Sequence, residues 1–449
     1  MKEIRYLIFI IILFNITYST YAESNNENLK EEINKIYIEA HKDSTAWNRM
    51  AEMCDLFGPR LTGSENLNNA LVWAEKKMKE DGLSNVVADE VELPSWVRGK
   101  EYFRLVSPWS GEIPMLGLGG SIGTNGKILK GKVIPISSKE DLDAKKDLVK
   151  NNIVLFDEKY LDYGHNVQYR VWGSSWAAKY GAIASIIRPV TPKSNQNAHT
   201  GVMRYVDTIQ KIPCLSITDE GANLLRRLYT RGITPEVEIY MEAHESTPRM
   251  SYNVMGEYRG TTMAGEIVAC GGHSDSWDAG IGTGAHDDAS ACIASWEAVK
   301  LLKRLGLKTK RTIRTVLWAD EEYRQTGGKK YAEKHGKEPH LGLLEFDSGC
   351  FTPNSVGFTG PDSLYDKLKS FESYFSIIDT SFNVNKGGGG VDVRGMQDLG
   401  YPVMGLGTKN DSYFLYHHSP LDVPESVNPK ELNDCVAAIA IIMYIYGNF

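Results

Sequence analysis

The strongest constraint on the fold is a series of short apolar runs, each followed directly by acidic or histidine residues. Glu266–Cys270 has the character of a buried strand and leads into Gly271-Gly272-His273-Ser274-Asp275. Thr312–Trp318 has the same character and leads into Ala319-Asp320-Glu321-Glu322. Between them, Asp288–Leu305 carries apolar residues at helical spacing. This alternation predicts an α/β domain in which helices flank a central mixed sheet.

Three more clusters of the same kind follow other predicted elements. Gly284-Ala285-His286-Asp287-Asp288 opens the predicted helix, and Leu343-Leu344-Glu345-Phe346-Asp347 follows a short apolar run. Tyr416-His417-His418-Ser419-Pro420-Leu421-Asp422 lies near the C-terminus. In open α/β sheets, ligands bind beyond the carboxyl ends of the strands, so we expect these clusters to meet. Nitrogen and oxygen donors without thiolates suit zinc, and less specifically manganese or cobalt.

Each cluster by itself has an ordinary structural explanation. A histidine and an aspartate two residues apart are more often a surface or core pair than metal ligands. Glu321-Glu322 could be a solvated face, and Asp287-Asp288 could cap a helix and stabilise its dipole. Their joint order after apolar runs favours a metal site, because charged residues have no structural reason to gather there.

Composition excludes several other classes of protein. The chain has 449 residues, of which 42% are hydrophobic, which is ordinary for globular domains. Its 50 Lys and Arg against 57 Asp and Glu give a formal net charge of -7, so no basic surface for nucleic acid or anionic membranes is expected. Six scattered cysteines are too few for a disulfide scaffold, although some pairs could be bonded in an oxidising compartment.

The N-terminus is predicted to be a signal peptide spanning residues 1–22. Lys2 and Arg5 precede the apolar run Tyr6–Phe14, and Thr20-Tyr21-Ala22 ends in a small residue. The alternative is an uncleaved signal anchor, but the apolar run is shorter than the roughly 20 residues that span a bilayer. The prediction is entry into the secretory pathway, to a secreted or lysosomal destination. Asn410-Asp411-Ser412 is a glycosylation sequon that counts only if exposed.

Both ends of the mature chain leave alternatives. Residues 23–45 are polar with apolar residues at helical spacing, which fits a surface helix or a removable pro-segment. Val436–Tyr446 is strongly apolar, so a lipid-anchor signal is conceivable. Asn428-Pro429-Lys430-Glu431 instead has the features of a helix start, which favours a buried final helix. No other stretch is long enough to span a membrane.

Residues 111–245 differ from the rest of the chain in their pattern of glycines and short apolar runs. Glycines separate short β-type runs such as Lys132–Ile136 and Ile153–Phe156. We therefore predict an inserted β-rich domain with few helices, flanked by catalytic-domain segments at residues 46–110 and 246–449. Gly387–Gly390 is expected to be a flexible loop and matches no phosphate-binding motif.

The order of the clusters, HxD, DD, EE, D and HxxxD, resembles dinuclear zinc exopeptidases of the transferrin-receptor-like metallopeptidase clan. The similarity covers essentially the mature chain, and residues 111–245 resemble a protease-associated domain. Further segments that carry the resemblance are Phe57–Ser64, Gln168–Arg170, Gly181–Ser185, Lys211–Pro213 and Asp275–Asp278.

The resemblance implies a role for each cluster residue. His273 corresponds to the histidine of the first zinc, Asp287 to the bridging carboxylate, and Glu322 to a ligand of the second metal. Asp347 and His418 complete the ligand set. Which of the two metals Asp347 binds, and which one Glu322 binds, is left open. Glu321 corresponds to the general base, and Asp275 to a carboxylate that fixes a histidine tautomer. The family further implies two zinc ions per subunit, short unblocked peptides as substrates, and a homodimer.

The sequence also departs from the family pattern. The loop between Asp278 and Asp287 is longer, and Gly387–Gly390 replaces a more polar stretch, which puts substrate preference in doubt. His286 could be an extra ligand, a substrate contact or a bystander. A tyrosine near the last histidine, Tyr413 or Tyr416, could stabilise the oxyanion.

The expected chemistry is hydrolysis of a peptide bond by a water that two metals share, with Glu321 as the proton acceptor. Two other hypotheses are a non-catalytic, receptor-like member of the clan and a glutaminyl cyclase-like acyltransferase. Receptor-like members lose metal ligands, and the cyclases use a single zinc and lack the insert. The sequence does not distinguish carboxypeptidase, aminopeptidase and dipeptidase activity, because these differ in which terminal charge of the peptide the site recognises.

Overall fold

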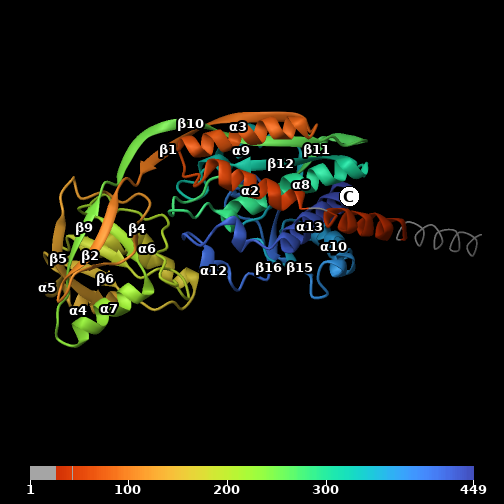
Figure 1. The fold of residues 1–449 in the computed structure, drawn as a ribbon. Helices are drawn as coiled ribbons and strands as arrows, with labels where there is room; N and C mark the ends of the chain where they lie inside the picture. The colour runs from red at the N-terminus through yellow and green to blue at the C-terminus, as the bar shows by residue number, and fades with distance from the viewer. Residues whose placement is uncertain (1–26, 43) are drawn as a thin grey trace, which may run out of the picture.

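The computed structural model describes residues 27–42 and 44–449, so the predicted signal peptide lies outside the described residues. The chain forms two lobes, each built on an eight-stranded sheet (Figure 1). The second lobe comprises residues 101–241, and the first lobe comprises the rest. Two long antiparallel strands, β1 (Ser84–Val97) and β10 (His244–Tyr258), lead from the first lobe to the second and back.

The sheet of the first lobe is mixed, as the sequence predicts. Its strand order is β1-β10-β12-β11-β13-β16-β14-β15, and β12, β11, β13 and β16 are parallel neighbours. The remaining strands are β12 (Arg311–Trp318), β11 (Met263–His273), β13 (His340–Glu345), β16 (Val403–Thr408), β14 (Pro353–Thr359) and β15 (Asn383–Lys386).

Strand register brings the predicted site residues to one edge of this sheet. His273, the last residue of β11, pairs with Trp318, the last residue of β12. Gly271 of β11 pairs with Glu345, the last residue of β13. Because these strands are parallel, the residues that follow them emerge side by side.

Helices cover both faces of this sheet. The final helix α13 is buried along nearly its whole length and packs against α2 and α8. The side chain of Asn428 accepts a hydrogen bond from the Lys430 N–H, so the predicted helix start and burial are confirmed. No helix in the described ranges is long and apolar enough to cross a membrane. The helices of the first lobe are α2 (Thr45–Phe57), α3 (Glu65–Glu80), η1 (Ala285–Ala289), α8 (Ser290–Leu305), α9 (Thr326–His335), α10 (Asp362–Lys369), η2 (Glu372–Ile377), α11 (Arg394–Asp398), α12 (Tyr413–Tyr416), η3 (Pro424–Ser426) and α13 (Pro429–Gly447).

The second lobe has a sheet of its own, in the order β3-β2-β9-β5-β6-β7-β8-β4. Its strand β2 begins at Glu101, ten residues before the start of the predicted insert at residue 111. The division of the chain into domains at residues 110 and 245 stays a prediction. The strands are β2 (Glu101–Ser107), β3 (Gly111–Glu112), β4 (Met115–Gly117), β5 (Leu129–Ile136), β6 (Ile153–Phe156), β7 (Ala184–Ile187), β8 (Cys214–Ile217) and β9 (Glu236–Met241).

The second lobe also contains more helix than its sequence suggests. Helix α6 (Tyr163–Ala178) has 16 residues and α7 (Asp219–Thr230) has 12. Two short helices, α4 (Lys139–Ala144) and α5 (Lys146–Val149), precede them. Helix α6 escapes detection because it buries small and polar residues, such as Gly173 and Ser174, and so lacks a clear apolar stripe.

The helical residues 27–40 pack on the core of the first lobe. Ile33 is 2% exposed and Ile36 is 0% exposed. The Tyr444 hydroxyl donates a hydrogen bond to Glu32 at 2.8 Å, which joins this helix to α13. One face of the segment is therefore buried against the final helix, and Figure 1 shows the two running close together beside the C-terminus.

Candidate metal centre and catalytic site

Asp287 occupies the centre of the predicted ligand cluster. It lies in η1, the short turn that precedes α8, and it is 4% exposed. Its Oδ1 lies 3.2 Å from His273 Nε2, and its Oδ2 lies 3.2 Å from His418 Nε2. One carboxylate therefore faces two histidines from opposite parts of the chain, as a bridging ligand would.

Of the other two predicted carboxylate ligands, Asp347 lies near His273 and Glu322 lies near His418. Asp347 Oδ1 lies 3.7 Å from His273 Nε2. Glu322 Oε2 lies 2.9 Å from His418 Nε2. The cluster thus has two halves that share Asp287, and each half holds one histidine and one further carboxylate.

The donor set fits divalent metal ions. The groups whose ligand atoms lie within 4.8 Å of one another include His273, Asp287 and Glu322, and a second group joins Asp287 to His418 and His417. Asp287 Oδ2 and Glu322 Oε1 are buried and lack a hydrogen-bond donor in the described part of the chain. Buried carboxylate oxygens without donors are costly unless a cation satisfies them.

Hydrogen bonds orient both histidines toward this cluster. His273 Nδ1 lies 3.1 Å from the backbone oxygen of Asp275, and His418 Nδ1 lies 3.3 Å from the backbone oxygen of Thr200. A tautomer with the proton on Nδ1 would donate to the carbonyl in each case and would leave Nε2 to face the carboxylates. Thr200 belongs to the second lobe, so that lobe helps to fix a ligand of the first.

At both histidines, the nearby carboxylates raise the pKa more than burial lowers it. Burial alone lowers the pKa of His418, but the nearby carboxylates of Glu322 and Asp287 raise that pKa to about 9. Burial likewise opposes the nearby carboxylates of Asp275, Asp287 and Asp347, which together raise the pKa of His273 well above its usual value. Such a site attracts cations strongly, and protons compete with metal for it.

Asp275 organises the carboxylates that follow β12. Its Oδ1 accepts the backbone N–H of Glu321 at 3.1 Å and its Oδ2 accepts that of Glu322 at 3.2 Å. The Thr62 hydroxyl donates to the same carboxylate at 3.0 Å. The predicted contact with His273 is made through the Asp275 backbone, because the carboxylate lies 3.7 Å from His273 Nδ1.

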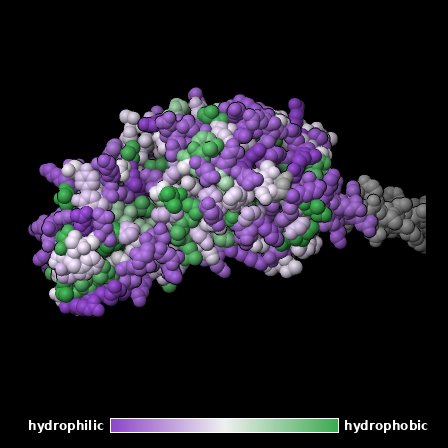
Figure 2. All heavy atoms as spheres, in the orientation of Figure 1, coloured by the Kyte–Doolittle hydropathy of each residue, from purple (hydrophilic) through white to green (hydrophobic). Residues whose placement is uncertain are grey.

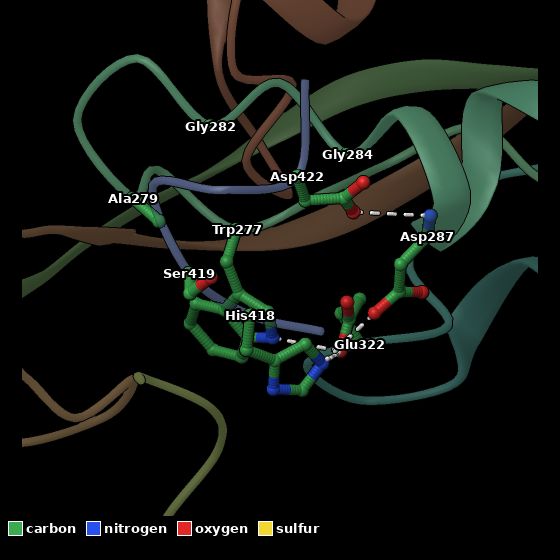
Figure 3. Close-up of a pocket in the computed structure, with 9 residues that line it drawn as sticks. All are labelled: Trp277, Ala279, Gly282, Gly284, Asp287, Glu322, His418, Ser419 and Asp422. Atoms are coloured by element: carbon green, nitrogen blue, oxygen red, sulfur yellow. Dashed lines mark hydrogen bonds and ion pairs between the residues drawn. The ribbon is translucent and has the colours of Figure 1, made fainter. Parts of the chain in front are cut away.

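Two further side chains hold Glu322 and Asp287 in place (Figure 3). The Trp277 indole N–H donates to Glu322 Oε2 at 2.7 Å. Asp422 accepts the backbone N–H groups of His286 at 2.7 Å and Asp287 at 3.1 Å. The aspartate of the HxxxD pattern therefore holds the backbone of Asp287 in place.

A cavity of about 450 Å³ opens directly onto this cluster. Glu321 and Glu322 lie on its wall beside Asp287 and His418. Burial, followed by the nearby charges of Asp347 and Glu322, raises the pKa of Glu321 well above its usual range. Residues of the second lobe form the opposite wall, namely Tyr163, Val167, Arg170, Val171, Val202 and Arg204.

Comparison with known proteins places this geometry in a family. The model of peptidase family M28 matches residues 253–443. Carboxypeptidase Q of Mus musculus is 34% identical over 95% of this chain and 90% of its own length. Carboxypeptidase Q of Homo sapiens is 34% identical over 90% of this chain and 85% of its own length.

The chain belongs to peptidase family M28. Among solved structures, a peptidase M28 precursor from Shewanella amazonensis superposes with a TM-score of 0.89 at 30% identity, covering 94% of this chain and 97% of that one. A zinc aminopeptidase from Bacillus subtilis shares the fold, with a TM-score of 0.66 at 18% identity, covering 89% of this chain and 94% of that one. The resemblance in sequence is thus confirmed, and the chain is a metallo-exopeptidase of the M28 family.

His286 occupies a position that the M28 resemblance left open. Its Nδ1 accepts the backbone N–H of Cys350 at 3.1 Å, and its Nε2 lies 3.1 Å from the backbone oxygen of Ser426. Phe351 and Tyr416 stack on its two sides, with ring centroids at 4.6 and 5.1 Å. Neither nitrogen is free for a metal or a substrate, which fits the bystander hypothesis.

Sequence reasoning missed Arg60, which is fully buried beneath the M28 ligand cluster. Its guanidinium donates to the backbone oxygens of Ser274 at 2.7 Å, Thr283 at 2.6 Å and Gly284 at 3.2 Å. Arg60 therefore ties together the loops that carry His273 and Asp287. The signal was the turn cluster Phe57–Ser64, which is similar to the family but suggested no role.

The sequence also raised the questions of disulfide bonds among the six cysteines and of glycosylation at Asn410. All six cysteines are buried free thiols, so the described chain contains no disulfide, and Cys350 Sγ lies 3.7 Å from Cys435 Sγ. Asn410 of the sequon is half-buried. Glycosylation at Asn410 stays a prediction.

Proposed function

We propose that this M28 chain is a dinuclear zinc exopeptidase that hydrolyses short unblocked peptides. The observation that carries the proposal is the position of Asp287 between His273 and His418, at 3.2 Å from each. A carboxylate with one oxygen toward each of two histidines suits a pair of metal ions better than a single one.

The spacing assigns the remaining ligands within the proposal. His273, Asp287 and Asp347 would hold one zinc, because Asp347 lies on the His273 side. His418, Asp287 and Glu322 would hold the other, because Glu322 lies on the His418 side. Bound zinc would supply a Lewis acid and lower the pKa of water in the cavity.

Glu321 is the proposed general base. It lines the cavity, and Asp275 fixes its backbone. No ion pair or hydrogen bond engages its carboxylate within the described ranges, and bound metal ions would favour its ionised form, which could accept a proton from water and pass it to the leaving amine. Asp275 acts through its neighbours as a positioning residue.

The oxyanion requires a hydrogen-bond donor on the same wall. Tyr413 lines the cavity, whereas Tyr416 stacks on His286. We therefore assign this role to Tyr413.

The non-catalytic alternative has less support. A receptor-like member would be expected to lack some of the ligands. Here four of the proposed ligands and the proposed base line one cavity, and the fifth ligand, His273, lies 3.2 Å from Asp287. The relatives are named as carboxypeptidases Q, and a structural neighbour is named as an aminopeptidase. The proposal further includes entry into the secretory pathway by residues 1–22, a secreted or lysosomal location, and a homodimer.

The experiment is product mass spectrometry on the purified protein with a free dipeptide, its N-acetyl form and its C-amide form. Each substrate is tested with zinc and with chelator, and Glu321→Gln gives the background. We expect zinc-dependent cleavage of the free dipeptide, with both blocked forms resistant. Cleavage of one blocked form would assign amino- or carboxypeptidase polarity, and no cleavage of any form would reject the enzyme hypothesis.

A further inference from the structure

Two cysteines of the first lobe are in contact inside its core. Cys350 lies in the loop between β13 and β14, and Cys435 lies in α13. Their sulfur atoms are 3.7 Å apart, and both side chains are 0% exposed. The two residues are 85 positions apart in the sequence, so only the fold brings them together. Each of the other four thiols instead contacts an oxygen atom, namely Cys54 the Thr283 carbonyl, Cys214 the Ser185 hydroxyl, Cys270 the Ser295 carbonyl and Cys292 the His273 carbonyl.

Hydrogen bonds already hold the two segments together around this pair. The Cys435 thiol donates to the backbone oxygen of Phe351 at 3.3 Å. One turn earlier in α13, the Glu431 carboxylate accepts the backbone N–H of Thr352 at 3.0 Å and its hydroxyl at 2.8 Å. The two thiols therefore face each other from segments whose relative position is fixed on both sides.

The distance between the sulfurs is within reach of a covalent bond. A disulfide requires the two sulfurs to move from 3.7 Å to about 2.05 Å apart. Small rotations about the two Cα–Cβ bonds can supply this movement. The alternative is that both thiols stay reduced and pack as small apolar groups, as buried cysteines often do.

We propose that Cys350 and Cys435 form a disulfide bond in the secreted protein, which fixes the loop that carries Asp347 to the final helix. The inference rests on the proposed entry into the secretory pathway, because that route supplies an oxidising compartment. Asp347 lies three residues before Cys350, so the bond would also limit the movement of a proposed metal ligand. The bond closes residues 350–435 into a ring, and a ring of this length strongly restricts the unfolded chain.

The bond would form by exchange with a disulfide oxidant such as oxidised glutathione. One cysteine thiolate attacks the oxidant, which gives a mixed disulfide and releases one glutathione thiol. The second cysteine thiolate then attacks the mixed disulfide and releases the other glutathione. Overall, the two cysteine thiols lose two electrons and two protons, and the S–S bond of the oxidant takes them up as two thiols.

This exchange belongs to folding. Burial, followed by the contact with Cys350, raises the pKa of the Cys435 thiol well above its usual value in the folded chain. A buried thiol of this kind reacts slowly, since the thiolate is the nucleophile. The bond should therefore form before α13 covers the sulfurs, and afterwards it should resist reductant unless the chain is unfolded.

The test is peptide mapping of the full chain, produced with residues 1–22 in a secretory host and collected from the medium. The denatured protein is alkylated before and after reduction and then digested. Before reduction, we expect a peptide with Cys350 joined to a peptide with Cys435, and alkylation of the other four cysteines. Alkylation of Cys350 and Cys435 without reduction overturns the inference, as does a bond from either of them to a different cysteine.

A second preparation separates this inference from the proposed secretory route. The chain is made in a reducing cytoplasm, unfolded, and refolded in a mixture of reduced and oxidised glutathione, where the same bond should form. If it forms there although the full chain is not exported by its host, the pairing stands and the secretory route is rejected. Export of a chain in which both thiols are free rejects the pairing and leaves the route in place.

Thermal unfolding of alanine variants gives an independent readout. Under oxidising conditions, Cys350→Ala, Cys435→Ala and the double variant should lower Tm by the same several degrees, because each removes the same bond. Refolding in reductant should remove most of the difference from the unmodified chain. Cys214→Ala is the matched control, since Cys214 is equally buried but lies in the second lobe, and its effect should not depend on reductant. Additive losses for the two single variants would mean that the thiols pack independently and would overturn the bond.

Discussion

The indole N–H of Trp277 donates a hydrogen bond to Glu322 Oε2 at 2.7 Å (Figure 3). Trp277 is 3% exposed and its ring lies 5.9 Å from that of His418, measured between centroids. It therefore contacts two proposed ligands of the same zinc. A tryptophan in this place fixes the rotamer of Glu322 and excludes water from one side of the cluster.

Replacing Trp277 with Phe should weaken zinc binding while keeping most of the packing. Loss of a hydrogen bond to a metal ligand typically costs about 10- to 100-fold in metal affinity or activity. We expect a loss in this range at the site formed by His418 and Glu322, measured by competition with a chromophoric chelator.

The control for that variant is Trp109→Phe, which changes an exposed tryptophan of the second lobe. Zinc affinity should not change in the control. Equal affinity for zinc in Trp277→Phe and the unmodified chain would mean that Glu322 does not depend on this bond.

Gly119 of the second lobe lies against the six-membered ring of the Trp277 indole. A Cβ atom at this position would lie 1.9 Å from Trp277 Cη2, which is far inside van der Waals contact. Gly119→Ala should therefore displace the indole, and with it Glu322, and lower both kcat and zinc affinity. Gly265→Ala is the matched control, because nothing lies within 4 Å of a Cβ atom there. Unchanged activity in Gly119→Ala would show that the lobes separate freely at this contact.

The convergence of His273, Glu322 and Asp347 could be predicted because each lies at or just after the end of an apolar strand, and parallel strands align their carboxyl ends. The predicted strand at Glu266–Cys270 corresponds to β11, and that at Thr312–Trp318 corresponds to β12. The predicted helix at Asp288–Leu305 corresponds to α8, which begins two residues later because η1 carries Asp287 and Asp288. The local pattern of apolar residues is therefore sufficient to predict these two strands and this helix.

Contacts across long sequence distances could not be predicted in the same way. The bond from Thr200 to His418 joins residues 218 positions apart, and Arg60 meets Ser274 across 214 positions. No periodicity marks either partner, since each is a single polar residue in a loop. The surface gives as little guidance, because hydrophilic residues cover most of the face seen in Figure 2.

Removal of metal should leave the fold intact. The core clusters of both lobes form without the ligand residues, so chelator should not change the far-ultraviolet circular dichroism. Zinc at 100 times its dissociation constant should stabilise the native state by about 2.7 kcal/mol per site. The expected result is a higher Tm with zinc, and a much smaller increase for Asp287→Asn. Unfolding by chelator alone would instead make the metal part of the fold.

Residues 27–42 should be needed for stability, whether or not residues before them are removed. Ile33 and Ile36 are buried against the first lobe, and burial of one such side chain contributes about 1.5–3 kcal/mol. A chain beginning at Ser44 should therefore unfold at a lower urea concentration than one beginning at Asn26. An unchanged midpoint would support a removable pro-segment.

His41, near the end of residues 27–42, should make the free energy of unfolding depend on pH. His41 Nε2 lies 2.9 Å from Asp434 Oδ1 of α13, and this hydrogen bond raises the pKa of His41 although partial burial opposes it. A histidine with a raised folded pKa stabilises the native state fully below its unfolded pKa of about 6.5, and the stabilisation is lost as the pH rises through the folded pKa. His41→Gln should thus cost up to about 1 kcal/mol below pH 6, since the pair is partly exposed. The cost should shrink as the pH rises through the folded pKa of His41, as followed by urea unfolding from pH 5 to 9. His244→Gln is the control, because His244 is exposed and bonds to the backbone oxygen of Glu242. A cost for His41→Gln that is the same at every pH would mean that the imidazole acts through packing and not through its charge.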